Sequence, residues 1–159
     1  ELFGVGFDNI DVVVHPQSVV HSMVEFADGA VIAQLSLPDM RLPIAYALGF
    51  PARSDIAFGA IDWTQLSRLD FETPDKSTFR CLDIAYQAGR IGGTAPAWLS
   101  AANEIAVEAV LDGHISWSKI AGVIEQTMQH HDGVSPTTVE DILNADASAR
   151  RFAALELTK

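Results

Sequence analysis

The first fifty residues alternate between apolar runs and turn signals, a pattern typical of β-strands. Residues 10–14 form a continuous β-branched run, which predicts a strand covered on both faces and ended by Pro16. Residues 19–26 and 30–36 are joined by Asp28-Gly29, a pair that favours a two-residue type I′ turn. We therefore expect a β-hairpin in this region.

The predicted turn fixes which residues of the two hairpin strands lie opposite each other. Counting outward from the turn pairs Val24 with Ala33, on a mostly apolar face that should meet a core. The other face is mixed in polarity and places His21 opposite Ser36. We expect something polar to lie over this second face.

From about residue 75 onward the hydrophobic pattern becomes helical. Ile120, Val123, Ile124 and Thr127 are spaced as one face of an amphipathic helix. Capping and stop signals mark the ends of the other helices. The predicted helices run from Ser77 to Ala88, from Thr94 to Gly113, from Ser116 onward, and from a capping box at 137–140 through an alanine-rich segment ending at Leu157.

The two patterns divide the chain into a β-rich part and a helical part. Residues 42–48 indicate a short helix ended by Gly49. Residues 50–74 lack periodicity, which indicates a linker that wraps over the sheet through Phe58, Trp63 and Leu66. We predict an α+β fold with a β-rich portion at 1–49, a linker at 50–74 and a helical bundle at 75–159.

Composition narrows the class of protein. With 159 residues, 48% of them hydrophobic, the chain can bury a core, and its net charge of −11 disfavours electrostatic binding to nucleic acid or anionic membranes. Cys81 is the single cysteine, which fits a reducing cytoplasm, and its apolar neighbours favour a core residue over a reactive thiol. No apolar run reaches the ~20 residues of a membrane span. Because the first residue is Glu1 and not methionine, we expect a fragment of a longer chain.

The candidate chemistry lies mainly in histidines. His15 precedes a proline and favours a structural role, with its ring bonded to the backbone. His21, on the polar hairpin face, has two open interpretations: a donor to a phosphate or hydroxyl, or a structural residue. Asp39 and Glu25 favour solvated or ion-paired roles over metal binding. His130-His131 ends a predicted helix, where positive charge suits the helix dipole.

Three segments closely resemble the 1-deoxy-D-xylulose 5-phosphate reductoisomerase family. They are IDVVVHPQSVVHSMVEFADG (10–29), AQLSLPDMRLPIAYALGFP (33–51) and AANEIAVEAVLDGHI (101–115). The pattern HPQS-x-x-HSMV followed by PDM at this spacing is specific. The resemblance implies that the chain is the end of a catalytic domain, a linker and a C-terminal bundle, with the NADPH-binding domain and metal ligands upstream of Glu1.

The resemblance also implies a reaction and a set of site residues. The family rearranges a ketose phosphate and reduces it with NADPH and a divalent cation, Mg or Mn, and is usually a homodimer. It places His21 in the active-site region, and Pro38 and Met40 in the pocket where the nicotinamide and a flap meet the substrate. For Met40 the alternative is burial against the next helix. No metal ligand is implied here, so the chain alone should be inactive; the alternative function is an independent dimerising or scaffolding module.

Overall fold

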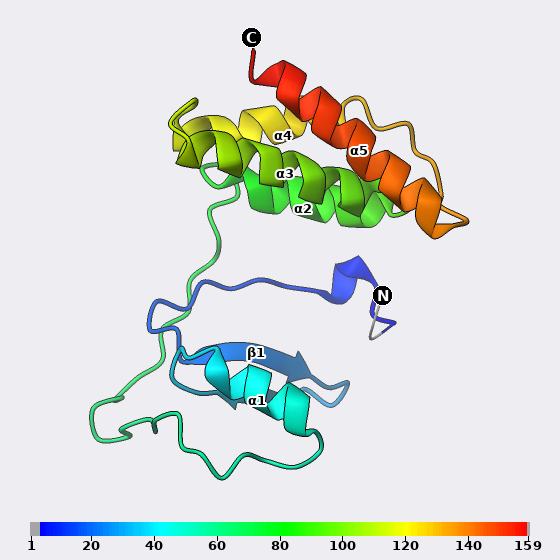
Figure 1. Cartoon of the computed structure of the whole chain (residues 1–159). Coiled ribbons are helices and arrows are strands. Elements are labelled where there is room, and N and C mark those ends of the chain that lie inside the picture. Colours follow the sequence, from blue (N-terminus) through cyan, green and yellow to red (C-terminus); the bar gives the residue numbers. More distant parts are fainter. Residues whose placement is uncertain (1–3, 159) are drawn as a thin grey trace. The chain divides into compact units, whose positions relative to one another are not determined.

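The structure is a computed structural model that describes residues 4–158, and these form two compact units (Figure 1). Residues 12–74 make up the hairpin unit, and residues 4–11 with 75–158 make up the helical unit. The described residues form a two-stranded antiparallel sheet and five α-helices. The predicted α+β class is therefore confirmed.

The hairpin unit is built from two strands and one helix. β1 (Val20–Glu25) and β2 (Val31–Leu35) pair antiparallel, and α1 (Arg41–Gly49) follows. These elements confirm the predicted hairpin and short helix. Gly49 is the last helical residue, directly before Phe50 and the segment that carries no regular element.

The hairpin turn differs from the prediction. Phe26 N–H donates to the Ala30 carbonyl at 2.8 Å, so three residues, not two, form the loop. The Asp28 side chain accepts the Ala30 N–H at 3.0 Å, and Gly29 takes a φ of 82°. The predicted type I′ turn is wrong because the aspartate side chain competes for the N–H that such a turn would use.

The longer loop shifts the strand register by one residue. Val24 lies opposite Ile32 instead of the predicted Ala33, and the pairing shifts again between Val20 and Ser22, where a bulge interrupts the ladder. The predicted contact of the apolar face with a core is also wrong: Val24 and Val31 of that face are each more than half exposed, and Phe26 is 48% exposed.

The predicted strand at 10–14 is not a strand. Only Val14 pairs, through one antiparallel bridge in which its N–H and carbonyl bond Glu72 at 2.9 Å each. The apolar residues of this run are exposed, whereas a strand covered on both faces needs neighbours on each side.

His15 helps to hold residues 50–74 in the hairpin unit. Its Nδ1 lies 2.7 Å from the Asp70 carbonyl oxygen, and its ring stacks on Phe71 with centroids 4.8 Å apart. Gln17 adds a second tie, because its Oε1 accepts the Asp70 N–H at 3.2 Å. The structural role predicted for His15 is confirmed.

The helical unit packs four helices around a core of small residues. They are α2 (Arg80–Ile91), α3 (Ala95–Leu111), α4 (Ile120–Met128) and α5 (Val139–Glu156), with short 3₁₀ turns at Phe7–Asn9 and Trp117–Lys119. Ala102, Ala106 and Ala153 are fully buried and let α3 and α5 approach closely around Ile124. Ile124 and Thr127 are buried as the helical spacing predicts.

The bounds of α2 correct the prediction at both ends. Ser77 lies before the helix, where its hydroxyl donates to the Asp75 carboxylate at 2.6 Å. Gly89 lies inside the helix instead of ending it, and the Phe7 ring packs so closely there that an added Cβ would overlap it. Cys81 is exposed, so its predicted core role is wrong; it lies in the first turn, ahead of the first buried residue, Ile84.

Two helix starts differ in detail from the sequence signals. α3 begins after Thr94 as predicted, but the Thr94 hydroxyl donates to the Val134 carbonyl at 3.0 Å and does not cap the helix. The capping box of α5 lies one residue later than predicted. Thr138 Oγ1 accepts the Asp141 N–H at 3.2 Å, and Asp141 Oδ2 accepts the Thr138 N–H at 2.9 Å.

Candidate functional site

The candidate site begins at the bulged end of the hairpin. His21 occupies the register shift, outside the regular ladder, and its side chain is exposed. Its Nδ1 lies 3.4 Å from Ser36 Oγ, which also accepts a hydrogen bond from Gln34 Nε2 at 3.3 Å. A bulge turns one side chain away from the regular alternation, and here it allows the imidazole to reach Ser36 across the strands.

A tight turn at 37–40 carries the other predicted site residues. The Asp39 N–H donates to the Leu37 carbonyl at 2.8 Å, which folds the backbone around Pro38. Met40 directly precedes α1 and is 71% exposed. The alternative in which Met40 is buried against the next helix is therefore wrong, and its thioether is open to a contact.

Asp39 is held by its neighbour Arg41. Arg41 Nε lies 3.0 Å from each carboxylate oxygen of Asp39, and its backbone N–H donates to Oδ1 at 2.9 Å. The side-chain hydrogen bond from Arg41 is the main reason that the pKa of Asp39 falls from 3.8 to about 2. The ion-paired role predicted for Asp39 is confirmed, and its charge is balanced locally.

A cavity of about 280 Å³ opens beside this turn, within the hairpin unit. Its lining joins the end of β2 and the start of α1 to the segment 58–63, and includes Leu35, Ser36, Asp39, Leu42, Phe58 and Trp63. The sequence predicted that Phe58 and Trp63 cover the sheet, and both lie at this cavity. It did not identify Ser36 or Asp39 as cavity residues; the tight turn that brings them there follows the Pro38 signal.

The arrangement offers two kinds of contact. His21 Nε2 has no partner among the described residues, so the ring can bond an oxygen of a small polar ligand while Ser36 holds its Nδ1 side. Pro38 and Met40 add exposed apolar surface that suits a flat ring. Of the predicted site residues, the structure brings His21 to Ser36, and it places neither Pro38 nor Met40 in the cavity lining.

The described residues do not supply a metal site. No three His, Cys, Asp or Glu side chains among residues 4–158 lie in a group that can hold a metal ion. Asp39, the carboxylate closest in sequence to Pro38 and Met40, is committed to Arg41. Among the same residues, no helix has the length and hydrophobicity to cross a bilayer.

Residues 35–152 match the family model described as the DXP reductoisomerase C-terminal domain. The 1-deoxy-D-xylulose 5-phosphate reductoisomerase of Chloroherpeton thalassium is 54% identical over 151 residues, 95% of this chain and 39% of that protein. The same enzyme from Chlorobaculum tepidum is 51% identical over 152 residues, 96% of this chain and 40% of that protein.

Among solved structures, the chain is likewise similar to 1-deoxy-D-xylulose 5-phosphate reductoisomerases. The chain resembles the reductoisomerase of Zymomonas mobilis in complex with NADPH with a TM-score of 0.91 and 41% identity, covering 99% of this chain and 42% of that one. A reductoisomerase in complex with NADPH, fosmidomycin and magnesium gives a TM-score of 0.88 at 39% identity, covering 99% of this chain and 41% of that one. The chain thus spans about two fifths of the length of its relatives. Since the family model matches more than half of the chain, the chain belongs to the DXP reductoisomerase C-terminal domain family.

Proposed function

We propose that this chain is the C-terminal part of an NADPH-dependent reductoisomerase that converts 1-deoxy-D-xylulose 5-phosphate to 2-C-methyl-D-erythritol 4-phosphate. The observation that carries the proposal is the 54% identity with the Chloroherpeton thalassium enzyme over 95% of this chain. Because the chain spans about two fifths of such relatives, the NADPH-binding domain and the ligands of the divalent cation, Mg or Mn, are assigned to segments outside residues 1–159.

In this proposal residues 21–40 form one wall of the active site. His21 donates to a hydroxyl or phosphate oxygen of the sugar phosphate, and the bond to Ser36 fixes the plane of its ring. Pro38 and Met40 pack against the nicotinamide ring, which supplies a hydride when NADPH is bound. A thioether suits this role because it contacts a flat ring without dictating one approach. The role of His21 is to orient the substrate.

The experiment is a chimera. The matched C-terminal part of the Chloroherpeton thalassium enzyme is replaced by this chain, and NADPH oxidation is followed with 1-deoxy-D-xylulose 5-phosphate and Mg²⁺. The chimera is expected to turn over, whereas the isolated 159-residue chain is expected to be inactive. Turnover by the isolated chain, or an inactive chimera that is folded, would refute the proposal.

His21→Gln tests the proposed wall within the same chimera. We expect a higher KM or a lower kcat with an unchanged circular dichroism spectrum, because glutamine keeps polarity but not the ring geometry. The matched control is His114→Gln, an exposed histidine of the helical unit, which should leave both constants unchanged. Equal kinetics for His21→Gln and the control would return His21 to a structural role.

We also propose a cytoplasmic homodimer whose contact includes the hairpin. The support is the exposed apolar surface of β1 and β2, where Val24, Val31 and Ile32 are each more than half exposed. Sedimentation of the chimera should give the mass of two chains. Ile32→Asp should shift that mass toward one chain, while Ile56→Asp, an equally exposed position outside the strands, should not.

A further inference from the structure

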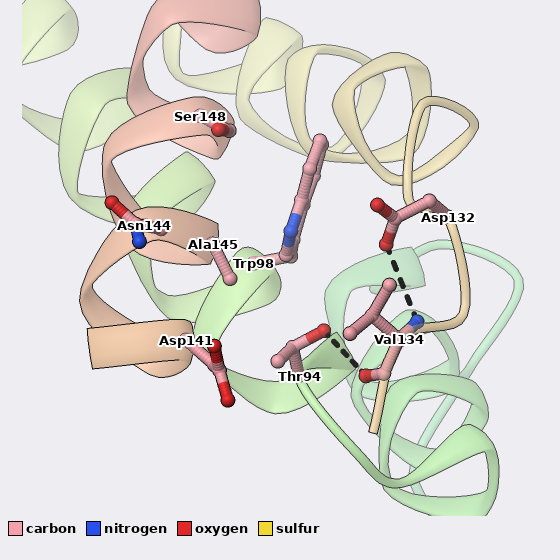
Figure 2. A pocket seen from close by; sticks show the side chains of 8 residues that line it. All are labelled: Thr94, Trp98, Asp132, Val134, Asp141, Asn144, Ala145 and Ser148. Atoms are coloured by element: carbon pink, nitrogen blue, oxygen red, sulfur yellow. Dashed lines mark hydrogen bonds between the residues drawn. The ribbon is translucent and has the colours of Figure 1, made fainter. Parts of the chain in front are cut away.

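The cavities of the two units differ in how their walls are held. In the helical unit, a cavity of about 210 Å³ has a loop wall that is bonded directly to α3, because the Thr94 hydroxyl donates to the Val134 carbonyl at 3.0 Å (Figure 2). In the hairpin unit, segment 58–63 and residues 35–42 line the cavity of about 280 Å³, yet no hydrogen bond among the described residues joins them. Segment 58–63, the cavity wall, is therefore positioned by packing and by bonds elsewhere in the chain.

The cavity wall packs against the turn at 37–40. Gly59, with a φ of 98°, lies so close to Leu37 that an added Cβ would be 2.8 Å from the Leu37 Cδ1 atom. The Arg41 guanidinium lies over the Phe58 ring, with its Cζ 5.7 Å from the ring centroid. Arg41 also bonds the carboxylate of the turn. A shift of the cavity wall would therefore change contacts on both sides of the turn.

Consecutive tight turns connect the cavity wall to residue 70. The Asp62 carbonyl accepts the N–H groups of Gln65 at 3.1 Å and Leu66 at 3.0 Å. The Asp62 carboxylate accepts the Thr64 N–H at 2.9 Å. Hydrogen-bonded turns shorten a segment and restrict its backbone dihedral angles. The position of residue 70 therefore limits where the cavity wall can lie.

The far end of this segment is bonded to the start of the hairpin unit. Val14 and Glu72 exchange two backbone hydrogen bonds of 2.9 Å each. The half-buried His15 ring adds a hydrogen bond and a stacking contact, since its Nδ1 lies 2.7 Å from the Asp70 carbonyl oxygen and its centroid 4.8 Å from that of Phe71. One imidazole thus contacts two successive residues of the segment.

The surroundings of His15 determine which ring nitrogen carries the hydrogen. A carbonyl oxygen only accepts hydrogen bonds, so Nδ1 donates to the Asp70 carbonyl. Nε2 is buried and has no hydrogen-bond partner among the described residues. A hydrogen on Nε2 would be a buried donor without an acceptor, which carries a desolvation cost. The arrangement therefore favours the neutral ring with its hydrogen on Nδ1.

We propose that His15 is a positioning residue for the site: as the neutral Nδ1–H tautomer it fixes residues 70–71, and through the cavity wall it holds the turn that carries Pro38 and Met40. In this role His15 touches neither substrate nor cofactor. The kinetic consequence rests on the proposed function, because it requires Pro38 and Met40 to contact the nicotinamide. The structural consequence, a fixed position of Met40, does not.

The first experiment follows the methionine methyl signals of the 159-residue chain by ¹H–¹³C NMR. The chain has three methionines, and Met40→Leu identifies the Met40 signal by its loss. His15→Phe keeps a ring that can stack but has no donor, so it should shift the Met40 signal and leave that of Met128 in the helical unit unchanged. His15→Asn puts an amide N–H near the place of Nδ1 and should keep the Met40 signal close to that of the parent.

Two further variants separate positioning from stability. Phe58→Leu removes the ring that contacts the guanidinium beside the turn, and should shift the Met40 signal in the same direction as His15→Phe. Asp28→Ala removes the side-chain bond that closes the hairpin turn, so it should destabilise the hairpin unit and leave the Met40 signal in place. Equal Met40 shifts in Asp28→Ala and His15→Phe would mean that the signal reports stability alone, which would overturn the proposal.

A second measurement determines the tautomer directly. Long-range ¹H–¹⁵N NMR distinguishes a ring nitrogen that carries a hydrogen from one that does not, and His15→Asn assigns the His15 signals among the five histidines by their loss. At neutral pH we expect the hydrogen of His15 on Nδ1. A hydrogen on Nε2 would contradict the proposal, because the ring could then not donate to the Asp70 carbonyl.

The third measurement is made in the chimera described above. His15→Phe should raise the KM for NADPH several-fold and leave kcat nearly unchanged, because a misplaced turn weakens binding of the nicotinamide equally in the ground and transition states. His15→Asn should restore most of the lost affinity for NADPH. A merely structural role of His15 would lower the amount of folded enzyme, and hence the apparent kcat, without changing KM.

The outcomes for the two proposals are distinguishable. An inactive parent chimera that is folded refutes the proposed function, and the Met40 signal then still decides the role of His15. An unmoved Met40 signal in His15→Phe overturns the positioning role even if the chimera turns over. If His15→Phe does not fold, Gln17→Ala takes its place: it removes the bond to the Asp70 N–H and should give a smaller Met40 shift in the same direction.

Discussion

The two units differ in whether they bury isoleucine side chains. Ile124 in α4 is 1% exposed, whereas Ile32 in β2 is 65% exposed. The helical unit closes a core from its own residues, because fully buried alanines let α3 and α5 meet around Ile124. A two-stranded hairpin has too little area to bury its own faces, so its apolar side chains remain available for other contacts. The comparison separates a unit that buries its apolar side chains against its own residues from a unit that leaves them exposed.

The largest effect should come from truncating the same residue in each unit. Ile124→Ala removes methyl groups from a closed core and should lower the free energy of unfolding of the helical unit by about 2–5 kcal/mol. Ile32→Ala removes atoms already in contact with water and should change the free energy of unfolding of the hairpin unit by less than about 0.5 kcal/mol. Urea unfolding followed by circular dichroism at 222 nm measures the first variant, and native-state hydrogen exchange of the β1 and β2 amides measures the second. Equal losses in the two variants would contradict this contrast between the units.

A smaller effect should come from glycines with positive φ. Gly93→Ala places a Cβ 2.8 Å from the Val134 oxygen at a φ of 56°, and should cost about 1–3 kcal/mol. Gly29→Ala, at a φ of 82°, meets no atom within 4 Å and should cost less. Native-state hydrogen exchange resolves each unit separately. A larger loss of protection in β1 and β2 from Gly29→Ala than in α3 from Gly93→Ala would contradict this ranking.

Signals from neighbouring residues predicted which helices and strands exist better than the residues at which they begin and end. The helical spacing from Ile120 to Thr127 and the hairpin flanking Asp28-Gly29 were read correctly, because each depends on residues close in sequence. The failures depend on other contacts. Gly89 is needed inside α2 because the ring of Phe7, 82 residues earlier, leaves no room there for a side chain, and the Thr94 hydroxyl bonds Val134 instead of capping α3. The residues next to Gly89 and Thr94 in the sequence do not include these partners, so local sequence signals could not have predicted the contacts.

The contact between His21 and Ser36 was predicted from the sequence, but from a strand register that the structure does not have. Sequence placed His21 opposite Ser36 from a two-residue turn, and the real turn has three residues. The bulge at His21 moves the pairing one residue further from the predicted register, since Val20 lies opposite Leu35 and the Ser36 N–H bonds the Val19 carbonyl. The imidazole nevertheless reaches Ser36 diagonally, with its Nδ1 3.4 Å from Ser36 Oγ. The roles of His21, Pro38 and Met40 in catalysis stay predictions, because they depend on contacts with a substrate and a nicotinamide that no hydrogen bond or packing contact among the described residues tests.

Acid should destabilise the helical unit through Asp141. The pKa of this residue falls from 3.8 to about 2 in the folded state, chiefly because Thr137 N–H bonds the carboxylate. Because the folded-state pKa is lowered, the contribution of ionised Asp141 to the free energy of unfolding is complete above about pH 4 and is lost as the pH falls toward about 2. Asp141→Asn removes the titrating group, so the variant should lose less stability than the parent between pH 5 and pH 2. Thermal unfolding by circular dichroism measures the difference, and parallel pH profiles would refute it.

The smallest effect should separate two aspartates with similarly low pKa values. Asp39 in the hairpin unit owes its value of about 2 mainly to Arg41, a side-chain cation that is 74% exposed, whereas Asp141 owes its value to backbone N–H groups. Salt screens exposed ion pairs but leaves short hydrogen bonds to the backbone largely intact. A change from low salt to about 1 M NaCl (Debye length ~3 Å) should therefore raise the pKa of Asp39 more than that of Asp141. Side-chain carboxyl ¹³C titrations by NMR at the two salt concentrations measure both pKa values. Arg41→Gln should remove most of the salt dependence at Asp39 and none at Asp141. If the pKa of Asp141 proves more sensitive to salt than that of Asp39, backbone N–H groups are not what lowers it. The proposed difference between the two aspartates would then be wrong.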